Sequence, residues 1–343
     1  MLAQALPPFV ESVQMVDARA GYAVGGRQTD RLPQLYRTAD GGVRWTVVTG
    51  AATPAAPPTV VGSRTVYFPT LRRGAIVVER SEDGGRTWRG SQPIRDRHPL
   101  GPGSVQVLAA GRLALVVGEG AAAGSSAQSL WTSADEGRTW RFVSRTSTTG
   151  EKGALPFSCD KTGIGFATPL RGFAAGACAG GRAFLYRTDD GGRAWRPLVL
   201  SGLSRCACDV DPPRFFGART GAFAVNGFPQ SGAGAPVARV YWTSDGGSRW
   251  RLTLPPLGRL GSASFPAAGV AWVPGTAHGS IRLPFDRLAR TTDAGRHWTV
   301  VRLPFDAQNA QLDVLGATRA FALVAQHRLL RTTDGGRSWQ TVG

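Results

Sequence analysis

Short apolar runs separated by turn residues recur along the whole chain. Near the N-terminus they cover Val13–Val16, Gly21–Gly25, Gln34–Arg37 and Trp45–Val48. The same order returns at Ile164–Ala167, Gly172–Gly176, Phe184–Arg187 and Trp195, and again at Leu312–Leu315, Ala320–Val324, Arg328–Arg331 and Trp339. Runs of this length with turn signals every 8–12 residues or so are typical of all-β proteins. No window has the sustained 3.6-residue apolar period of a helix. The pattern predicts a repeated unit of four short strands.

The unit is marked by an eight-residue motif, Ser/Thr-x-Asp-x-Gly-x-x-Trp, which we call the box motif. Its seven copies are Thr38–Trp45, Ser81–Trp88, Ser133–Trp140, Thr188–Trp195, Thr243–Trp250, Thr291–Trp298 and Thr332–Trp339. Their tryptophans are Trp45, Trp88, Trp140, Trp195, Trp250, Trp298 and Trp339. Neighbouring copies are 41 (Trp298 to Trp339) to 55 (Trp140 to Trp195) residues apart. A period of this size indicates a repeat architecture.

The chemistry of the motif fits a tight turn between two strands. The hydroxyl and the carboxylate can accept hydrogen bonds from backbone N–H groups a few residues on. The glycine permits a backbone conformation that a side chain resists, and the tryptophan opens the next strand with a large packing surface. We therefore expect a structural role for the box tryptophans and for the box aspartates Asp40, Asp83, Asp135, Asp190, Asp245, Asp293 and Asp334.

Seven motif copies in one chain predict an all-β fold, a single seven-bladed β-propeller of four-stranded antiparallel blades. One propeller domain would take up residues 1–343. The expected blades cover approximately 9–50, 51–93, 94–145, 146–200, 201–255, 256–302 and 303–343. Leu6–Val10 could close the ring by adding to the last blade.

The motif resembles the BNR repeat, also called the Asp-box. With a copy in every expected blade, the chain is most similar to the photosystem II assembly and stability factors and their bacterial relatives. The phrase Gly21–Gly25 followed by Thr38–Trp45 carries that likeness. More distant resemblances are to sialidases, sortilin-type receptors and xyloglucanases. The resemblance implies a non-enzymatic binding or assembly scaffold, with a sialidase-type glycoside hydrolase as the alternative.

The net charge of +17 comes almost entirely from arginine, since only Lys152 and Lys161 of the 40 basic residues are lysine. Eleven arginines fall in box motifs or in the turn between the first two strands of a blade: Arg19, Arg64, Arg86, Arg112, Arg138, Arg171, Arg193, Arg219, Arg296, Arg319 and Arg337. They either pair locally with box aspartates and carbonyls or form an electropositive face for a protein or another anionic macromolecule. Nucleic acid is disfavoured because loop aromatics are not clustered.

The four cysteines, Cys159, Cys178, Cys206 and Cys208, lie near the expected boundary of blades four and five. Disulfides are the favoured interpretation, with free buried thiols or a metal site as alternatives. A bond between Cys206 and Cys208 would close a small, strained ring. We therefore expect Cys159 and Cys178 each to pair with one of Cys206 and Cys208, joining the two blades.

Candidate binding residues lie in the long loops opposite the box turns. These are Ala51–Pro58, Ile94–Gly103, Ser144–Leu155, Ser201–Asp211 and Phe228–Pro236. Arg95, Arg97 and His98 form their most polar group. The four histidines are scattered singly, so no metal site and no cofactor are expected.

A sialidase would require a tyrosine nucleophile with a glutamate base, as the resemblance implies. Of the five tyrosines only Tyr67 lies outside the repeated positions, and no catalytic residue is expected. The sequence contains no apolar run of about 18 residues, so no membrane-spanning helix is expected. We expect a monomer that is exported to the cell envelope or the outside, with a signal peptide that this sequence does not include. A cytoplasmic location is the alternative.

Overall fold

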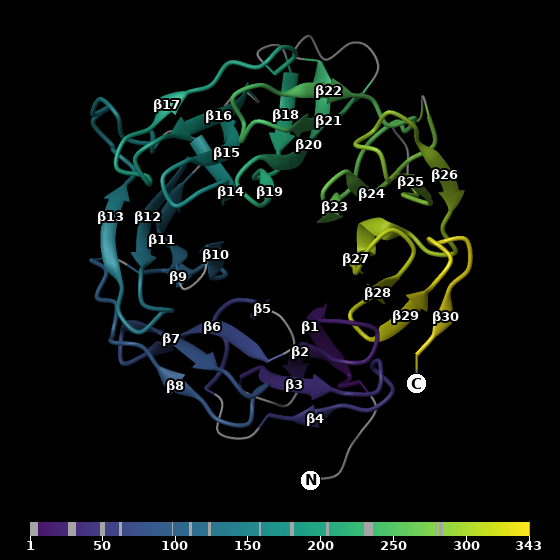
Figure 1. Cartoon of the computed structure of the whole chain (residues 1–343), viewed down its shortest axis with the longest axis horizontal. Helices are drawn as coiled ribbons and strands as arrows, with labels where there is room; N and C mark the ends of the chain where they lie inside the picture. The colour runs from purple at the N-terminus through teal and green to yellow at the C-terminus, as the bar shows by residue number, and fades with distance from the viewer. Residues whose placement is uncertain are drawn as a thin grey trace. The chain divides into compact units, whose positions relative to one another are not determined.

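A computed structural model describes residues 6–26, 32–48, 52–61, 64–97, 99–109, 112–122, 125–157, 159–178, 182–203, 206–229, 236–278, 280 and 284–342. The fold is the predicted all-β, seven-bladed propeller of four-stranded antiparallel blades (Figure 1). Within the described residues, the one helical element is the single 3₁₀ turn η1 (Ala307–Asn309). The chain divides into two compact units. Unit 1 comprises Met1–Val117, Thr132–Arg141 and Pro304–Gly343, and unit 2 comprises Gly118–Trp131 and Phe142–Leu303.

Unit 1 contains three complete blades. Blade one consists of β1 (Phe9–Met15), β2 (Gly21–Gly26), β3 (Gln34–Thr38) and β4 (Thr46–Val47). Blade two consists of β5 (Thr59–Val61), β6 (Thr65–Arg72), β7 (Ala75–Ser81) and β8 (Arg89–Gly90). Blade seven consists of β27 (Ala310–Val314), β28 (Ala320–Val324), β29 (Arg328–Thr332) and β30 (Gln340–Thr341).

Blade three contributes strands to both units. It consists of β9 (Gly101–Pro102), β10 (Gln106–Ala109), β11 (Arg112–Ala122), β12 (Ser125–Ser133) and β13 (Arg141–Arg145). The short β9 pairs with β11 beside the main strand order β10–β11–β12–β13.

Unit 2 contains blades four, five and six. Blade four consists of β14 (Cys159–Phe166), β15 (Gly172–Cys178), β16 (Arg182–Thr188) and β17 (Arg196–Pro197). Blade five consists of β18 (Cys206–Val210), β19 (Arg214–Phe216), β20 (Thr220–Pro229), β21 (Val237–Thr243) and β22 (Arg251–Thr253). Blade six consists of β23 (Ser264–Ala267), β24 (Val270–Gly275), β25 (Arg287–Thr291) and β26 (Thr299–Arg302).

The first strand of blade five is broken in two. β18 and β19 both pair with β20, and Pro212 and Pro213 lie between them. Proline has no N–H for the ladder and forces the residue before it into an extended conformation. The break therefore fixes Asp211 at the end of β18, where its own N–H still donates to Ala224 O at 3.0 Å.

The core lies between the faces of consecutive blades. In unit 2, Phe173 and Leu185 of blade four pack with Phe223 and Tyr241 of blade five. The next cluster joins Trp242 and other residues of blade five to blade six. In unit 1, one cluster joins blades one and two and another joins blades one and seven. Blades one and five are thus packed against a neighbour on both faces, which explains their nearly continuous apolar second strands.

Blades one and seven meet through β1, and Leu6–Val10 does not add to the last blade as expected. Phe9–Met15 is instead the first strand of blade one, paired with β2. Its contacts with blade seven are made by the side chain of Gln311, which accepts from Val13 N at 3.2 Å and donates to Val13 O at 3.1 Å. The Val10 N–H also donates to Gln326 O at 2.8 Å. The backbone groups of β1 that face β2 are already paired in the sheet of blade one. The groups on the other edge of β1 are therefore the ones that bond to blade seven.

The disulfides differ from the expected pairing, which was wrong. Cys159 bonds to Cys178, and Cys206 bonds to Cys208. The first two residues are direct partners across β14 and β15, with Cα atoms 4.1 Å apart. The second two alternate on β18 and share one face, with Cα atoms 5.2 Å apart. Each bond therefore lies within one blade, because strand register places each cysteine nearer to its blade partner.

Candidate functional site

The hydroxyl of every box motif binds the turn in the same way. The Ser or Thr oxygen accepts from the box glycine N–H at 2.7–2.9 Å in all seven copies. In blade one, Thr38 Oγ1 also donates to Asp40 Oδ1 at 2.9 Å. Gly42 has φ of 92°, and a Cβ there would lie 2.6 Å from Leu329 Cδ2. Conformation and space both require glycine at this position.

The box carboxylate closes the second half of the turn. Asp334 Oδ1 accepts from the N–H groups of Arg337 and Ser338, each at 3.0 Å. The Ser338 hydroxyl and amide hold the pKa of Asp334 well below its usual range. The amide and then the hydroxyl of Thr87 do the same to the pKa of Asp83. These carboxylates already serve the turn, so they offer little to a ligand.

Five of the seven box tryptophans donate their indole N–H to the box glycine carbonyl, at 2.8–3.2 Å. In the described residues, the buried indole nitrogens of Trp250 and Trp298 have no such partner. Their rings still pack, Trp250 against Phe223 and Phe173 and Trp298 against the core of blades five and six. Trp45 and Trp195 are buried and the other five are half-buried, so the seven tryptophans share neither one hydrogen bond nor one degree of burial.

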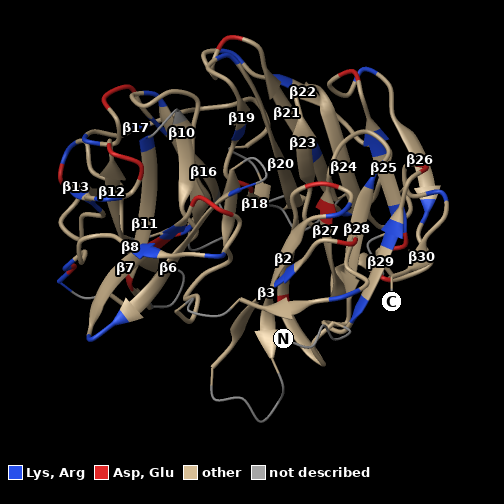
Figure 2. Cartoon of the chain, turned by 60° about the horizontal axis from the view of Figure 1, so that its bottom comes forward, with Lys and Arg blue, Asp and Glu red and all other residues tan. Residues whose placement is uncertain are grey.

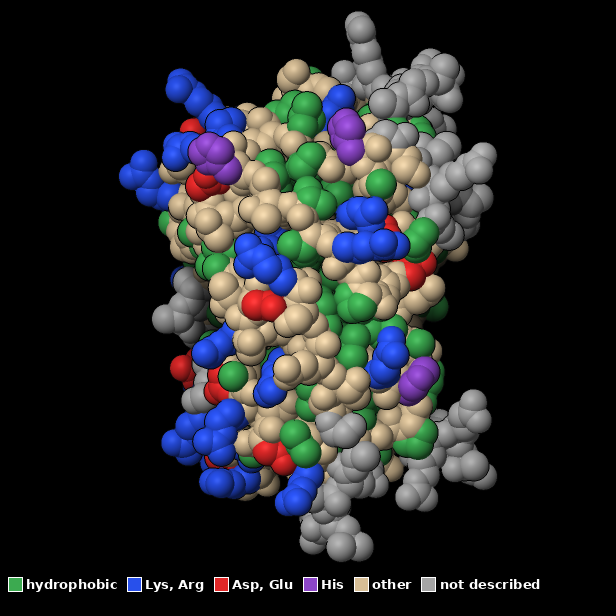
Figure 3. Space-filling model, turned by 90° about the vertical axis from the view of Figure 1, so that its right-hand side faces the viewer, with side chains coloured by type: hydrophobic (Ala, Val, Ile, Leu, Met, Phe, Trp, Pro, Cys, Tyr) green, Lys and Arg blue, Asp and Glu red, His purple; other side chains and the backbone are tan. Residues whose placement is uncertain are grey.

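Several of the turn arginines pair locally. Arg193 donates to Asp190 O at 2.7 Å, Arg337 to Asp334 O at 3.2 Å and Arg219 to Ser244 O at 3.4 Å. Arg171 reaches both the Asp189 carboxylate at 3.1 Å and Asp245 O at 3.4 Å. Figure 2 shows basic and acidic positions next to each other at the tips of the turns. Figure 3 shows basic side chains scattered among polar and apolar ones on one side of the molecule.

Of the polar group expected at Arg95, Arg97 and His98, the structure describes the two arginines. Arg95 and Arg97 are exposed beside Ile94, which makes an isolated bridge to Ile76. His98 lies outside the described residues.

Tyr67, the tyrosine considered for sialidase chemistry, is 4% exposed. It lies on β6 directly opposite Arg80 of β7, whose guanidinium carbon is 6.0 Å from its ring centroid. Arg80 also pairs with Glu82 and Glu136. A phenol enclosed in this way is not presented to a sugar.

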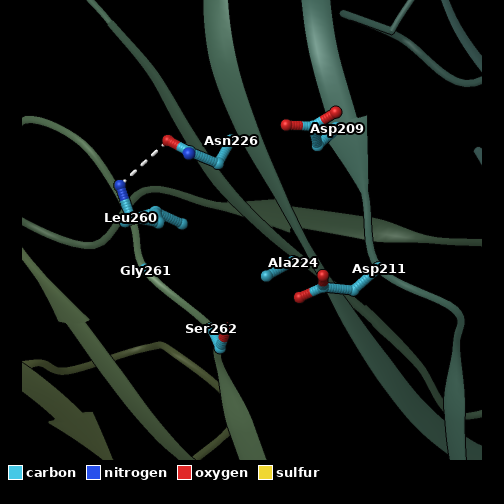
Figure 4. A pocket seen from close by; sticks show the side chains of 7 residues that line it. All are labelled: Asp209, Asp211, Ala224, Asn226, Leu260, Gly261 and Ser262. Carbon is cyan, nitrogen blue, oxygen red and sulfur yellow. Dashed lines mark hydrogen bonds between the residues drawn. The ribbon is translucent and has the colours of Figure 1, made fainter. Parts of the chain in front are cut away.

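A pocket of about 220 Å³ lies between blades five and six, wholly within unit 2. Its acidic wall is formed by Asp209 and Asp211, which lie on the same face of blade five (Figure 4). The other wall is the segment Leu260, Gly261 and Ser262, which precedes β23. Ala224 and Asn226 of β20 lie between the two walls.

Strand alternation positions the pocket side chains. On β18, Cys206, Cys208 and Val210 face the core, so Asp209 faces the opposite way. Asp209 is directly opposite Asn226 on β20. The Asn226 amide oxygen accepts from Leu260 N at 2.9 Å, which fixes the blade-six segment against blade five. The disulfide and the acidic side chains thus occupy opposite faces of one strand.

The pocket is electrostatically unusual for a chain with a net charge of +17. Within the described residues, neither the Asp209 nor the Asp211 carboxylate has a hydrogen bond or an ion pair. Burial, and then the negative charge of Asp209, raise the pKa of Asp211 to about 7. A cationic group entering the pocket would relieve both effects.

Lys161 is a second buried charge, but its donors are occupied. Its ammonium donates to Ser126 O at 2.7 Å, Cys159 O at 2.6 Å and Phe157 O at 3.3 Å. Burial lowers the pKa of Lys161 to about 8. Because three carbonyls take up its three hydrogens, this lysine ties blade four to the preceding segment.

One of the loops expected from the sequence overlaps this pocket. Ser201–Asp211 was among the expected binding loops, yet Cys206–Val210 is a strand and the pocket is built on it. The signal was the alternation Cys206-x-Cys208 with Asp209-x-Asp211, followed by two prolines. Nothing local could have indicated Asn226 or Leu260, which join the site through register and blade packing.

Across the described residues, no group of three or more His, Cys, Asp or Glu could hold a metal ion, and no helix could cross a membrane.

Comparison with solved structures shows the same fold at low sequence identity. YCF48 bound to a D1 peptide has a TM-score of 0.59 and 17% identity, over 97% of this chain and 94% of that one. YCF48 from Cyanidioschyzon merolae has a TM-score of 0.58 and 16% identity, over 96% and 97%. The GH74 xyloglucanase from Xanthomonas campestris has a TM-score of 0.60 and 18% identity, over 98% of this chain but only 54% of that one. No protein-family model and no curated protein matches the sequence.

Proposed function

We propose that this chain is a non-enzymatic binding or assembly scaffold that recognises a protein partner. The observation that carries the proposal is the acidic pocket of Asp209 and Asp211 between blades five and six. Two carboxylates without partners in the described residues, beside an amide, provide acceptors for a lysine ammonium or an arginine guanidinium. Because Asp211 is partly buried, a cation there would be screened less than at the open surface.

The size of the pocket favours a side chain over a larger ligand. Ligand clefts for small molecules are typically about 300–1,000 Å³, whereas this pocket measures about 220 Å³. One side chain of a partner peptide fits such a volume. The excess of arginine elsewhere favours a partner that is acidic as a whole, so one basic anchor would sit inside a mainly acidic segment.

The solved structure of YCF48 with a D1 peptide supports the proposal to a limited extent. It is a propeller of the same fold that binds a peptide, but 17% identity transfers the fold alone. The box motifs are consistent with Asp-box repeats in the same role, as a scaffold whose loops bind. We also propose export to an oxidising compartment, supported by the two disulfides.

Glycoside hydrolysis is a second candidate, favoured by the same pair of carboxylates. Glycosidases use one protonated and one ionised carboxyl group, and a pKa of about 7 for Asp211 would suit the acid. The small pocket and the buried Tyr67 argue against a sialidase in particular.

Selection from a random heptapeptide display library tests the binding proposal. Immobilised wild-type protein should enrich peptides containing lysine or arginine, and Asp209→Asn with Asp211→Asn should abolish that preference. The control is Asp306→Asn, a half-buried carboxylate that caps η1 in unit 1. Wild-type protein that enriches no basic residue, or a double variant that keeps the preference, would refute the proposal.

A further inference from the structure

Arg259 stands beside the acidic pocket and is held by stacking. Its guanidinium carbon is 5.5 Å from the ring centroid of Phe228 and 5.6 Å from that of Phe285. The backbone is fixed as well, because Arg259 N donates to Thr276 Oγ1 at 2.8 Å and Thr276 N donates to Arg259 O at 3.0 Å. Two aromatic faces and two backbone bonds orient the guanidinium before any ligand arrives.

The guanidinium has no acceptor among the described residues. Its Nε atom is buried without a hydrogen-bond partner, and the side chain makes no ion pair there. Arginine offers five N–H donors in a planar fork that matches a carboxylate. A buried donor without an acceptor is destabilising. The side chain is thus fixed in position with its carboxylate-binding donors unused.

Strand register places this cation next to the acidic pocket. Phe228, under Arg259, is two residues from Asn226 on β20, so both side chains project from the same face. Two residues of a strand span about 6.6–6.8 Å. Asn226 lies opposite Asp209, and Leu260, the next residue after Arg259, lines the pocket. The Phe228 position, on which Arg259 stacks, therefore lies one same-face step along the strand from Asp209 and two steps from Asp211, which is opposite Ala224.

We propose that the site recognises an extended peptide with a basic residue and an acidic residue two positions apart, Lys/Arg-x-Asp/Glu. In an extended peptide, side chains at positions i and i+2 point to one side with that same spacing. The basic side chain enters the pocket of Asp209 and Asp211, and the acidic side chain accepts from Arg259. This inference rests on the proposed function and adds to it an acidic residue of the peptide, two positions from the basic one.

The heptapeptide library, selected against Arg259→Gln, separates the two ideas. Wild-type protein should enrich peptides that contain Lys/Arg-x-Asp/Glu or the reversed order, Asp/Glu-x-Lys/Arg. Arg259→Gln should still enrich the basic residue but lose the acidic residue two positions away. Arg249→Gln, an exposed arginine in the box turn of blade five, is the control and should select like the wild type.

A defined peptide measures the effect. With a fluorescein-labelled Gly-Ser-Lys-Ser-Glu-Ser-Gly amide, replacing glutamate by glutamine should weaken binding to wild-type protein about tenfold, the usual size for a hydrogen bond to a charged group. The same replacement should have little effect on Arg259→Gln. Equal binding of both peptides to wild-type protein would overturn the inference without needing any variant to fold. A wild-type preference for lysine alone would overturn it while leaving the proposed function intact.

Discussion

Replacing Asp211 by asparagine should stabilise the protein at alkaline pH and leave its stability almost unchanged in acid. The side chain keeps its shape, but it loses the negative charge that burial and Asp209 oppose. The pKa of Asp211 rises from 3.8 to about 7 in the folded chain. The folded state therefore binds this proton more tightly than the unfolded state does.

The sign and size of the effect follow from that difference. Below about pH 4 the carboxyl is protonated in both states and adds no penalty. Between about pH 4 and pH 7 the unfolded state releases the proton first, so stability falls as the pH rises, and above about pH 7 the full penalty remains. At about 1.4 kcal/mol per pKa unit the limit is about 4 kcal/mol. Since the pocket is open to water, we expect a gain of about 1–3 kcal/mol for Asp211→Asn at pH 8.

Urea unfolding followed by tryptophan fluorescence, at a series of pH values from about 4 to 8, measures this gain directly. Asp209→Asn is the matched control. It removes only the secondary cause of the shift from an exposed position, and so should give a smaller gain. A gain for Asp211→Asn that does not depend on pH, or a loss of stability at pH 8, would refute the assignment of a buried, destabilising carboxylate.

Four further predictions follow from the same structure. Binding of the lysine-containing peptide should be tighter at pH 8 than at pH 5.5, because Asp211 is then ionised, and the reverse order in fluorescence anisotropy would contradict the pocket. Asp190→Ala should lower the free energy of unfolding by about 1–3 kcal/mol, since Asp190 accepts from Ala194 N at 3.0 Å, and it should not selectively abolish binding. Non-reducing peptide mapping should recover two peptides linked through Cys159 and Cys178 and one peptide with an internal Cys206–Cys208 bond, and a link between the two blades would contradict the register. Purified protein should not release fluorophore from a sialic acid substrate, and turnover that disappears in Tyr67→Phe would favour the hydrolase instead.

The box turns were predictable because all their chemistry is local. Thr38 bonds to the Asp40 carboxylate and to the Gly42 N–H within one eight-residue motif. The sequence alone therefore determines which groups pair. Repetition then multiplies a single short-range rule into a fold, as each blade must bury both faces against neighbours of the same kind. The seven-bladed architecture could be inferred from the sequence for this reason.

The disulfide pairing could not be predicted from local sequence in this way, because it depends on how the strands are paired. The sequence places Cys159 and Cys178 at strand ends, but only the β14–β15 ladder, shifted between Lys161 and Gly163, makes them direct partners. A shift of one residue would have turned them to opposite faces. Ring strain favoured pairing across two blades. In the structure, however, each cysteine already lies close to a second cysteine of its own blade.

The pocket shows where local reasoning ends and tertiary structure begins. Asp211 owes its position to two prolines that interrupt a first strand, a departure from the repeat that occurs in blade five. Arg259 precedes the pocket residue Leu260 and stacks on Phe228 of blade five, a contact that no spacing in the sequence encodes. A repeat scaffold fixes each of its regular positions by identical turns, so its individual chemistry must come from positions that break the repeat. On that reasoning, the broken strand of blade five is a better guide to function than the seven repeated boxes. The charges gathered there, and not the turn aspartates, are the ones to mutate first.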